Sequence, residues 1–208
     1  STPLYSSAAS DVYKRQGKEI NIGVKDVTAY AVPTTVAIFA LSSFISSDVL
    51  LVKHFFSATE AGYYGGLSLV GKVIFYFTGP IPSVMFPLIV KKHAVSENFR
   101  NLFFVAIVMV LIPAFLISGF YFLFPDFTIK LFLGGKGYLA IAPYLGLFGI
   151  FLTVYSVNNV FVNFFISVKK TKMCLVALFW AIIQIILICI FHDNFYLYVG
   201  SLDSMIAL

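Results

Sequence analysis

Two ionisable side chains stand inside long apolar stretches, where their type and position could support chemistry. Asp48 lies near the end of the stretch Val27–Val52, and Lys72 lies early in the next one, Gly65–Val90. Counted from the helix ends at 1.5 Å per residue, Asp48 is about 6 Å deep and Lys72 about 10 Å deep. Because consecutive spanning helices run antiparallel, we expect Asp48 and Lys72 to meet.

This pair has two interpretations. A charge near the centre of a bilayer costs about 2.5–3.5 kcal/mol on insertion scales, so it usually has a partner or a function. In the first interpretation, Asp48 and Lys72 line a water-filled cavity where Lys72 binds an anionic group. In the second, Asp48 caps its helix near the interface while Lys72 extends outward to the headgroups.

A later apolar stretch carries a line of polar side chains. Offsets of three, four and eight residues place them on one helical face. They either line a substrate path or form hydrogen bonds to neighbouring helices. The stripe as a whole favours a cavity. Its members are Tyr155, Asn158, Asn159 and Asn163.

Prolines predict a break in the second apolar stretch. Each internal proline removes a backbone donor and frees a carbonyl, which bends a helix. The run Gly79-Pro80-Ile81-Pro82 is the expected kink, and Pro87 follows it. We therefore predict Pro80, Pro82 and Pro87 as hinge residues.

These residues are positioned by membrane helices. Hydrophobic residues make up 60% of the chain and charged residues only 11%, against about 25% charged in soluble domains. The apolar runs are continuous and too long for barrel strands, so we expect an all-α bundle. Five full spans are predicted, with a truncated sixth: Val27–Val52, Gly65–Val90, Asn101–Phe124, Leu139–Ser167, Met173–Phe191 and the partial Phe195–Leu208.

The first 16 residues differ from the rest. Ser1–Gln16 is polar, lacks periodicity and is unlike a signal peptide. We expect this tail to be non-native or disordered, and residues 17–208 to form one transmembrane lobe.

Basic residues in the loops predict the orientation. Ten lysines and arginines fall on the side that holds the N-terminus, and three fall on the other side. The positive-inside rule then places the N-terminus in the cytoplasm. The net charge of +5 therefore reflects topology, and we expect a lipid bilayer rather than nucleic acid as the surrounding partner.

The sequence contains no nucleophile–base pair and no metalloprotease motif, so we expect the protein not to be an enzyme. His54, His93 and His192 are scattered without metal-ligand spacing, so no metal or cofactor is predicted. The glycine-rich stretch at residues 134–137 lacks a Ser or Thr after Lys136, so it is a helix terminator rather than a phosphate loop.

Several motifs occur in a family-like order. Asp48 closes a helix, Glu60-Ala61-Gly62-Tyr63-Tyr64 ends the following connector Lys53–Tyr64, and Phe86-Pro87 precedes the basic Lys91-Lys92. With the later stretch Leu133–Leu145, this order resembles the bacterial polysaccharide biosynthesis flippases, within the multidrug/oligosaccharidyl-lipid/polysaccharide exporter superfamily.

The resemblance implies two six-helix lobes around a central cavity, of which this sequence covers most of the second. It implies a bacterial cytoplasmic-membrane protein that flips lipid-pyrophosphate-linked oligosaccharides by alternating access, with a first lobe of the same chain as partner. Lys72 would meet the pyrophosphate, and the Asn and Tyr side chains the sugars. Coupling to a Na+ or H+ gradient, with Asp48 as the acidic group, is possible.

Three alternatives remain open from the residues, and one of them is a non-transporting structural membrane subunit. A cation-coupled multidrug antiporter of the same superfamily would favour a more acidic cavity than Asp48 and Lys72 supply. A membrane-embedded glycan polymerase or ligase would need a large outer loop, and no loop here exceeds about 15 residues.

Overall fold

The computed structural model describes residues 23–134, 136–170, 178–179, 181–183 and 185–186. The predicted tail Ser1–Gln16 and the partial span Phe195–Leu208 lie outside these ranges, and Met173–Phe191 is described only in part. The chain divides into two units, Ser1–Val32 and Pro33–Leu208. All packing described below lies within the second unit.

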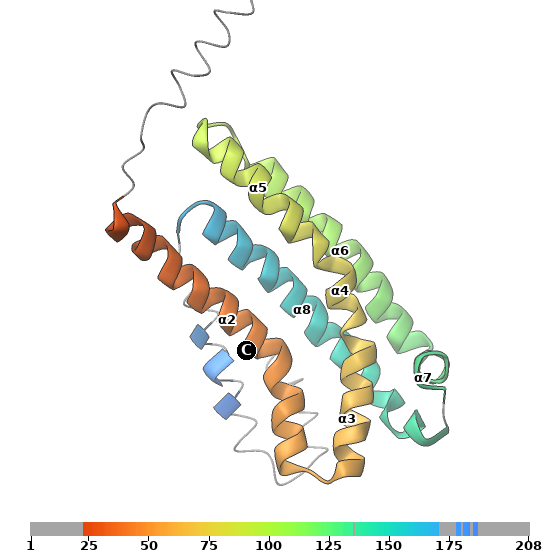
Figure 1. The fold of residues 1–208 in the computed structure, drawn as a ribbon. Helices are drawn as coiled ribbons and strands as arrows, with labels where there is room; N and C mark the ends of the chain where they lie inside the picture. The colour runs from red at the N-terminus through yellow and green to blue at the C-terminus, as the bar shows by residue number, and fades with distance from the viewer. Residues whose placement is uncertain (1–22, 135, 171–177, 180, 184, 187–208) are drawn as a thin grey trace, which may run out of the picture. The chain divides into compact units, whose positions relative to one another are not determined.

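The described residues are helical and contain no strand, which confirms the all-α class. Figure 1 shows the order of the elements. They are α2 (Val24–Phe55), α3 (Ala58–Gly71), α4 (Val73–Thr78), α5 (Pro80–Ala94), α6 (Arg100–Leu123), α7 (Pro125–Leu133), the 3-10 segment η1 (Lys136–Ile141) and α8 (Ala142–Ser167).

Four of the described helical stretches are long and apolar enough to cross a membrane. Each corresponds to one of the first four predicted spans. Their bounds are Val27–Phe55, Ala58–Ala94, Arg100–Leu123 and Gly137–Ser167. Within this bundle, α8 packs against α3, α4, α5 and α6.

The predicted connector Lys53–Tyr64 is wrong, because the chain turns within two residues. Helix α2 continues to Phe55, and Ser57 caps α3. The Ser57 hydroxyl accepts from the Glu60 amide at 3.3 Å, and Glu60 Oε2 accepts from the Ser57 amide at 3.1 Å. This capping box satisfies the first amides of α3, so the Glu60–Tyr64 motif is helical.

The second predicted span is broken in two places. One break is the expected one, at Gly79 and Pro80, between α4 and α5. Pro80 and Pro82 have no N–H, so two carbonyls in α4 lack their usual helical donor. The other break, at Lys72 between α3 and α4, was not expected. There the Tyr121 hydroxyl of α6 donates to the Val70 carbonyl at 2.7 Å.

A glycine next to this second break lets α3 approach α8 closely. A Cβ built on Gly71 would overlap the ring of Phe148, a fully buried side chain of α8. By contrast, a Cβ on Gly62, in the same helix, has nothing within 4 Å. The bend at Lys72 is thus held between Phe148 and Tyr121.

We expect Gly71→Ala to lower the free energy of unfolding by about 1–3 kcal/mol, because overpacking displaces the Phe148 ring or the α3 backbone. The matched change Gly62→Ala should be neutral or stabilising, since alanine favours helix. Thermal unfolding of both purified variants in detergent measures the difference. Equal melting temperatures for the two variants would contradict the close approach.

The glycine-rich stretch ends a helix, as predicted. Gly134 follows α7 with a φ of 65°, in the left-handed region, and its amide donates to the Lys130 carbonyl. Glycine adopts this conformation without steric cost. The stretch is therefore part of the turn from α7 into η1.

Candidate functional site

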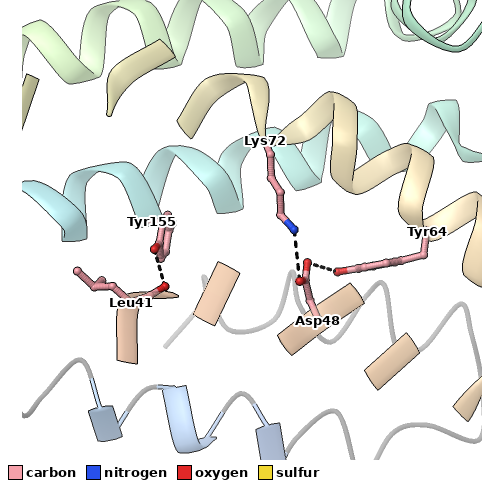
Figure 2. Close-up of polar contacts among 5 residues, drawn as sticks. All are labelled: Leu41, Asp48, Tyr64, Lys72 and Tyr155. Carbon is pink, nitrogen blue, oxygen red and sulfur yellow. Dashed lines mark hydrogen bonds and ion pairs between the residues drawn. The ribbon is translucent and has the colours of Figure 1, made fainter. Parts of the chain in front are cut away.

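Asp48 and Lys72 meet inside the bundle, as expected for neighbouring antiparallel helices. Lys72 Nζ lies 3.4 Å from Asp48 Oδ1, and the Tyr64 hydroxyl donates to Asp48 Oδ2 at 2.9 Å (Figure 2). Asp48 is only 3% exposed and Tyr64 is fully buried. The carboxylate is thus held by a cation and a phenol. We refer to Asp48, Tyr64 and Lys72 as the polar cluster.

Both partners of Asp48 come from the same broken span. Tyr64 lies in the second turn of α3, and Lys72 occupies the bend where α3 ends and α4 begins. Asp48 lies in the last turns of α2. The short α2–α3 turn at Ser57 makes the two helices antiparallel neighbours, so one carboxylate can reach both side chains. Sequence reasoning missed Tyr64 because a tyrosine at this position also suits the membrane interface.

An unpartnered hydroxyl lies close to Lys72 in the sequence. Ser68 is 2% exposed, and its hydroxyl has no hydrogen-bond partner in the part of the chain that the structure describes. It precedes Lys72 by four residues, a spacing that puts side chains about 5–6 Å apart on a helix. The Ser47 hydroxyl, next to Asp48, is buried and unpartnered among the described residues as well. The cluster therefore has spare hydrogen-bonding capacity.

Aromatic side chains join α2 to α8 near the polar cluster. Phe44 stacks on Phe151 and on Tyr155, with ring centroids 5.6 and 5.4 Å apart. The ring of Phe75 meets Tyr155 at 5.2 Å, edge to face. The Tyr155 hydroxyl donates to the Leu41 carbonyl of α2 at 2.7 Å (Figure 2). Tyr155 is thus buried and directed at α2.

These contacts attach α2 in a different way from the other helices. Among the described residues, the α8 backbone approaches α3, α4, α5 and α6 closely, whereas α2 shows little close backbone approach to any of them. Long side chains span the distance instead: Phe44 and Tyr155 on one side, Asp48 and Lys72 on the other. The attachment of α2 therefore depends on a few specific side chains.

The structure divides the predicted polar stripe of α8. Tyr155 is buried against α2, whereas Asn158 is exposed. Asn159 and Asn163 are half-buried, and the Asn163 amide donates to the Asn159 carbonyl at 2.8 Å and to its side-chain oxygen at 2.9 Å. None of the described contacts joins these asparagines to Lys72. Their proposed place in a sugar path stays a prediction.

The three predicted hinge prolines occupy different positions in α5. Pro80 begins α5 and Pro82 is buried two residues later, next to the break, whereas Pro87 lies inside the continuous helix α5. The break itself is therefore associated with Pro80 and Pro82. Whether any of the three moves during a functional cycle stays a prediction.

The polar cluster can bind a charged ligand through Lys72, whose ammonium is already paired with Asp48. Asp48 and Lys72 compensate each other, so an anion that binds Lys72 competes with the Asp48 carboxylate for the ammonium or shares it. In the described part of the chain, no group of three or more His, Cys, Asp or Glu side chains could hold a metal ion. The arrangement fits ion pairing and hydrogen bonding with a ligand.

Comparison of the chain with protein-family models, curated proteins and solved structures found no match. The flippase resemblance therefore depends on the order of the sequence motifs alone.

Proposed function

We propose that this chain is one lobe of a membrane transporter that flips a lipid-pyrophosphate-linked oligosaccharide across the bacterial cytoplasmic membrane by alternating access. The lobe begins in the cytoplasm and contains five spans and part of a sixth. A preceding lobe of the same protein completes the central cavity. The observation that carries the proposal is the Asp48–Lys72 ion pair in helices otherwise suited to lipid.

The ion pair supports binding of an anion that moves through the membrane. Lys72 has a side chain that is 13% exposed, so it is sheltered from most of the solvent without being sealed. Charge-assisted hydrogen bonds between a lysine and a phosphate are strong in such surroundings. A pyrophosphate that takes the place of Asp48 forms an ion pair with the Lys72 ammonium, and the Ser68 hydroxyl offers it a further hydrogen-bond donor.

The attachment of α2 supports a change of shape. Because α2 is joined to the bundle largely by side chains, a ligand that draws Lys72 from Asp48 removes one of its main ties. The breaks at Lys72 and Gly79 give the adjoining span places to bend. Binding at Lys72 is thereby coupled to the position of α2, as alternating access requires.

The ion pair also bears on the antiporter alternative. A cation-coupled antiporter needs an acidic group that is available to a cation. Here Asp48 already faces the Lys72 ammonium at 3.4 Å, and that positive charge repels a second cation. Asp48 serves a coupling ion, Na+ or H+, only after Lys72 has moved away to the substrate.

Complementation tests the proposed function. The full-length protein that contains this chain is expressed in a strain deleted for its own polysaccharide flippase. We expect surface polysaccharide to return, and drug resistance to stay at the level of the empty vector. A gain of drug resistance without surface polysaccharide would favour the antiporter and refute the flippase.

A further inference from the structure

A groove runs between α5 and α6, away from the polar cluster. Its volume is about 280 Å³, and only apolar side chains line it, among them Ile81, Val84 and Leu88 of α5 and Leu102, Val105 and Met109 of α6. The two helices lie side by side (Figure 1). Val84, Val105 and Met109 are each more than half exposed, so the groove opens outward from the bundle.

The length of the groove matches one leaflet of a bilayer. On α5 it extends from Pro80 to Leu88, or about 12 Å at 1.5 Å per residue. Half of a ~30 Å hydrocarbon core is about 15 Å. A single acyl chain that enters from one side of the membrane could therefore fill it.

One end of the groove is basic. The α5 residues that line it repeat at three and four residues, and the next positions on the same face are Lys91 and Lys92. Lys91 is exposed and has no ion-pair partner among the described residues. Lys92 pairs with Glu97 at 3.1 Å, but their side chains are 43% and 59% exposed, and ion pairs open to solvent are weak. Both ammonium groups are available to a headgroup about one helical turn beyond Leu88.

We propose that this groove binds an anionic phospholipid, with one acyl chain between α5 and α6 and the phosphate at Lys91 and Lys92. A zwitterionic lipid fits the apolar part equally well but has no net charge to offer the lysines. Charge complementarity therefore selects the anionic lipid. The proposal does not depend on which cargo the protein carries, because the groove and the polar cluster share no residue.

Quenching of tryptophan fluorescence by brominated lipids tests the site. The single tryptophan, Trp180, is first replaced by Phe, and a probe is introduced by Val84→Trp in the groove. A matched probe, Phe104→Trp, lies on α6 at a similar depth but about 150° around the helix from the groove face. The purified protein is placed in nanodiscs that contain either brominated phosphatidylglycerol or brominated phosphatidylcholine at equal mole fraction.

We expect phosphatidylglycerol to bind at the groove probe at least about fivefold more tightly than phosphatidylcholine, from a contribution near 1 kcal/mol per lysine. The preference should disappear in Lys91→Gln/Lys92→Gln and persist in Lys91→Arg/Lys92→Arg. It should also persist in Arg100→Gln, since Arg100 begins α6 on the face opposite the groove. Equal quenching by both lipids, an unchanged preference after Lys91→Gln/Lys92→Gln, or the same preference at Phe104→Trp would each overturn the proposal.

Discussion

Replacing Lys72 with Met will lower the free energy of unfolding by about 3–5 kcal/mol, the largest stability loss expected from a single substitution in this chain. The cause is the carboxylate left behind. Asp48 is 3% exposed, and Lys72→Met removes the ammonium that lies 3.4 Å from this buried carboxylate. Thermal or denaturant unfolding of the purified protein in detergent measures the loss.

Removal of the other charge, by Asp48→Asn, should lower the free energy of unfolding by less. In Asp48→Asn the amide oxygen still accepts from Tyr64, and the Lys72 ammonium is left on a long, flexible stem. That stem can move toward the membrane surface, as lysines near helix ends commonly do. The double variant Asp48→Asn/Lys72→Met removes both charges, and a buried pair replaced by neutral groups is often near neutral in stability. We expect it to recover most of the loss seen in Lys72→Met.

An exposed ion pair of the same chain supplies the control. Glu97 and Lys92 lie 3.1 Å apart, closer than Asp48 and Lys72, but their side chains are 59% and 43% exposed. Glu97→Gln should therefore change the free energy of unfolding by less than about 1 kcal/mol. If Lys72→Met were as mild as Glu97→Gln, the ion pair would not contribute to the stability of the bundle.

The meeting of Asp48 and Lys72 was predictable because it follows from one-dimensional rules. Continuous apolar runs define the helices, consecutive spans run antiparallel, and both charges lie in the half of their span that is nearer the connection. The break at Gly79 and Pro80 was predictable for the same reason, since proline acts on its own helix. The Ser57–Glu60 capping box is a recognisable sequence signal for a helix start. It was overlooked because the adjacent Phe55 and Phe56 made the segment resemble an aromatic connector at the membrane surface.

Other features depend on residues far apart in the sequence. The break at Lys72 is associated with two such contacts. The Tyr121 hydroxyl donates to the Val70 carbonyl, 51 positions earlier, and the ring of Phe148 lies against Gly71. The hydrogen bond from Tyr155 to Leu41 joins residues 114 positions apart. Helical periodicity placed Tyr155 on one face with the asparagines, but it could not show that Phe44 would draw that ring toward α2.

Transport will separate the structural role of Lys72 from a role in binding substrate. If Lys72 only neutralises Asp48, the charge-free double variant Asp48→Asn/Lys72→Met should be stable and should still restore surface polysaccharide. If Lys72 meets the pyrophosphate, the same variant will reach the membrane in normal amounts and fail to transport. We expect the second result, with a loss of about tenfold or more, since a hydrogen bond to a charged group contributes about 1.5–3 kcal/mol.

Conservation of charge provides the complementary arm of this test. Lys72→Arg retains a cation that can face both Asp48 and a phosphate, although its planar geometry differs from that of an ammonium. We expect it to keep a substantial part of the transport that Asp48→Asn/Lys72→Met loses. Membrane levels of each full-length variant are measured by immunoblot, and surface polysaccharide is normalised to them. Normal transport by the double variant would remove Lys72 from the binding site and leave the polar cluster as a tie between α2 and the α3–α4 bend.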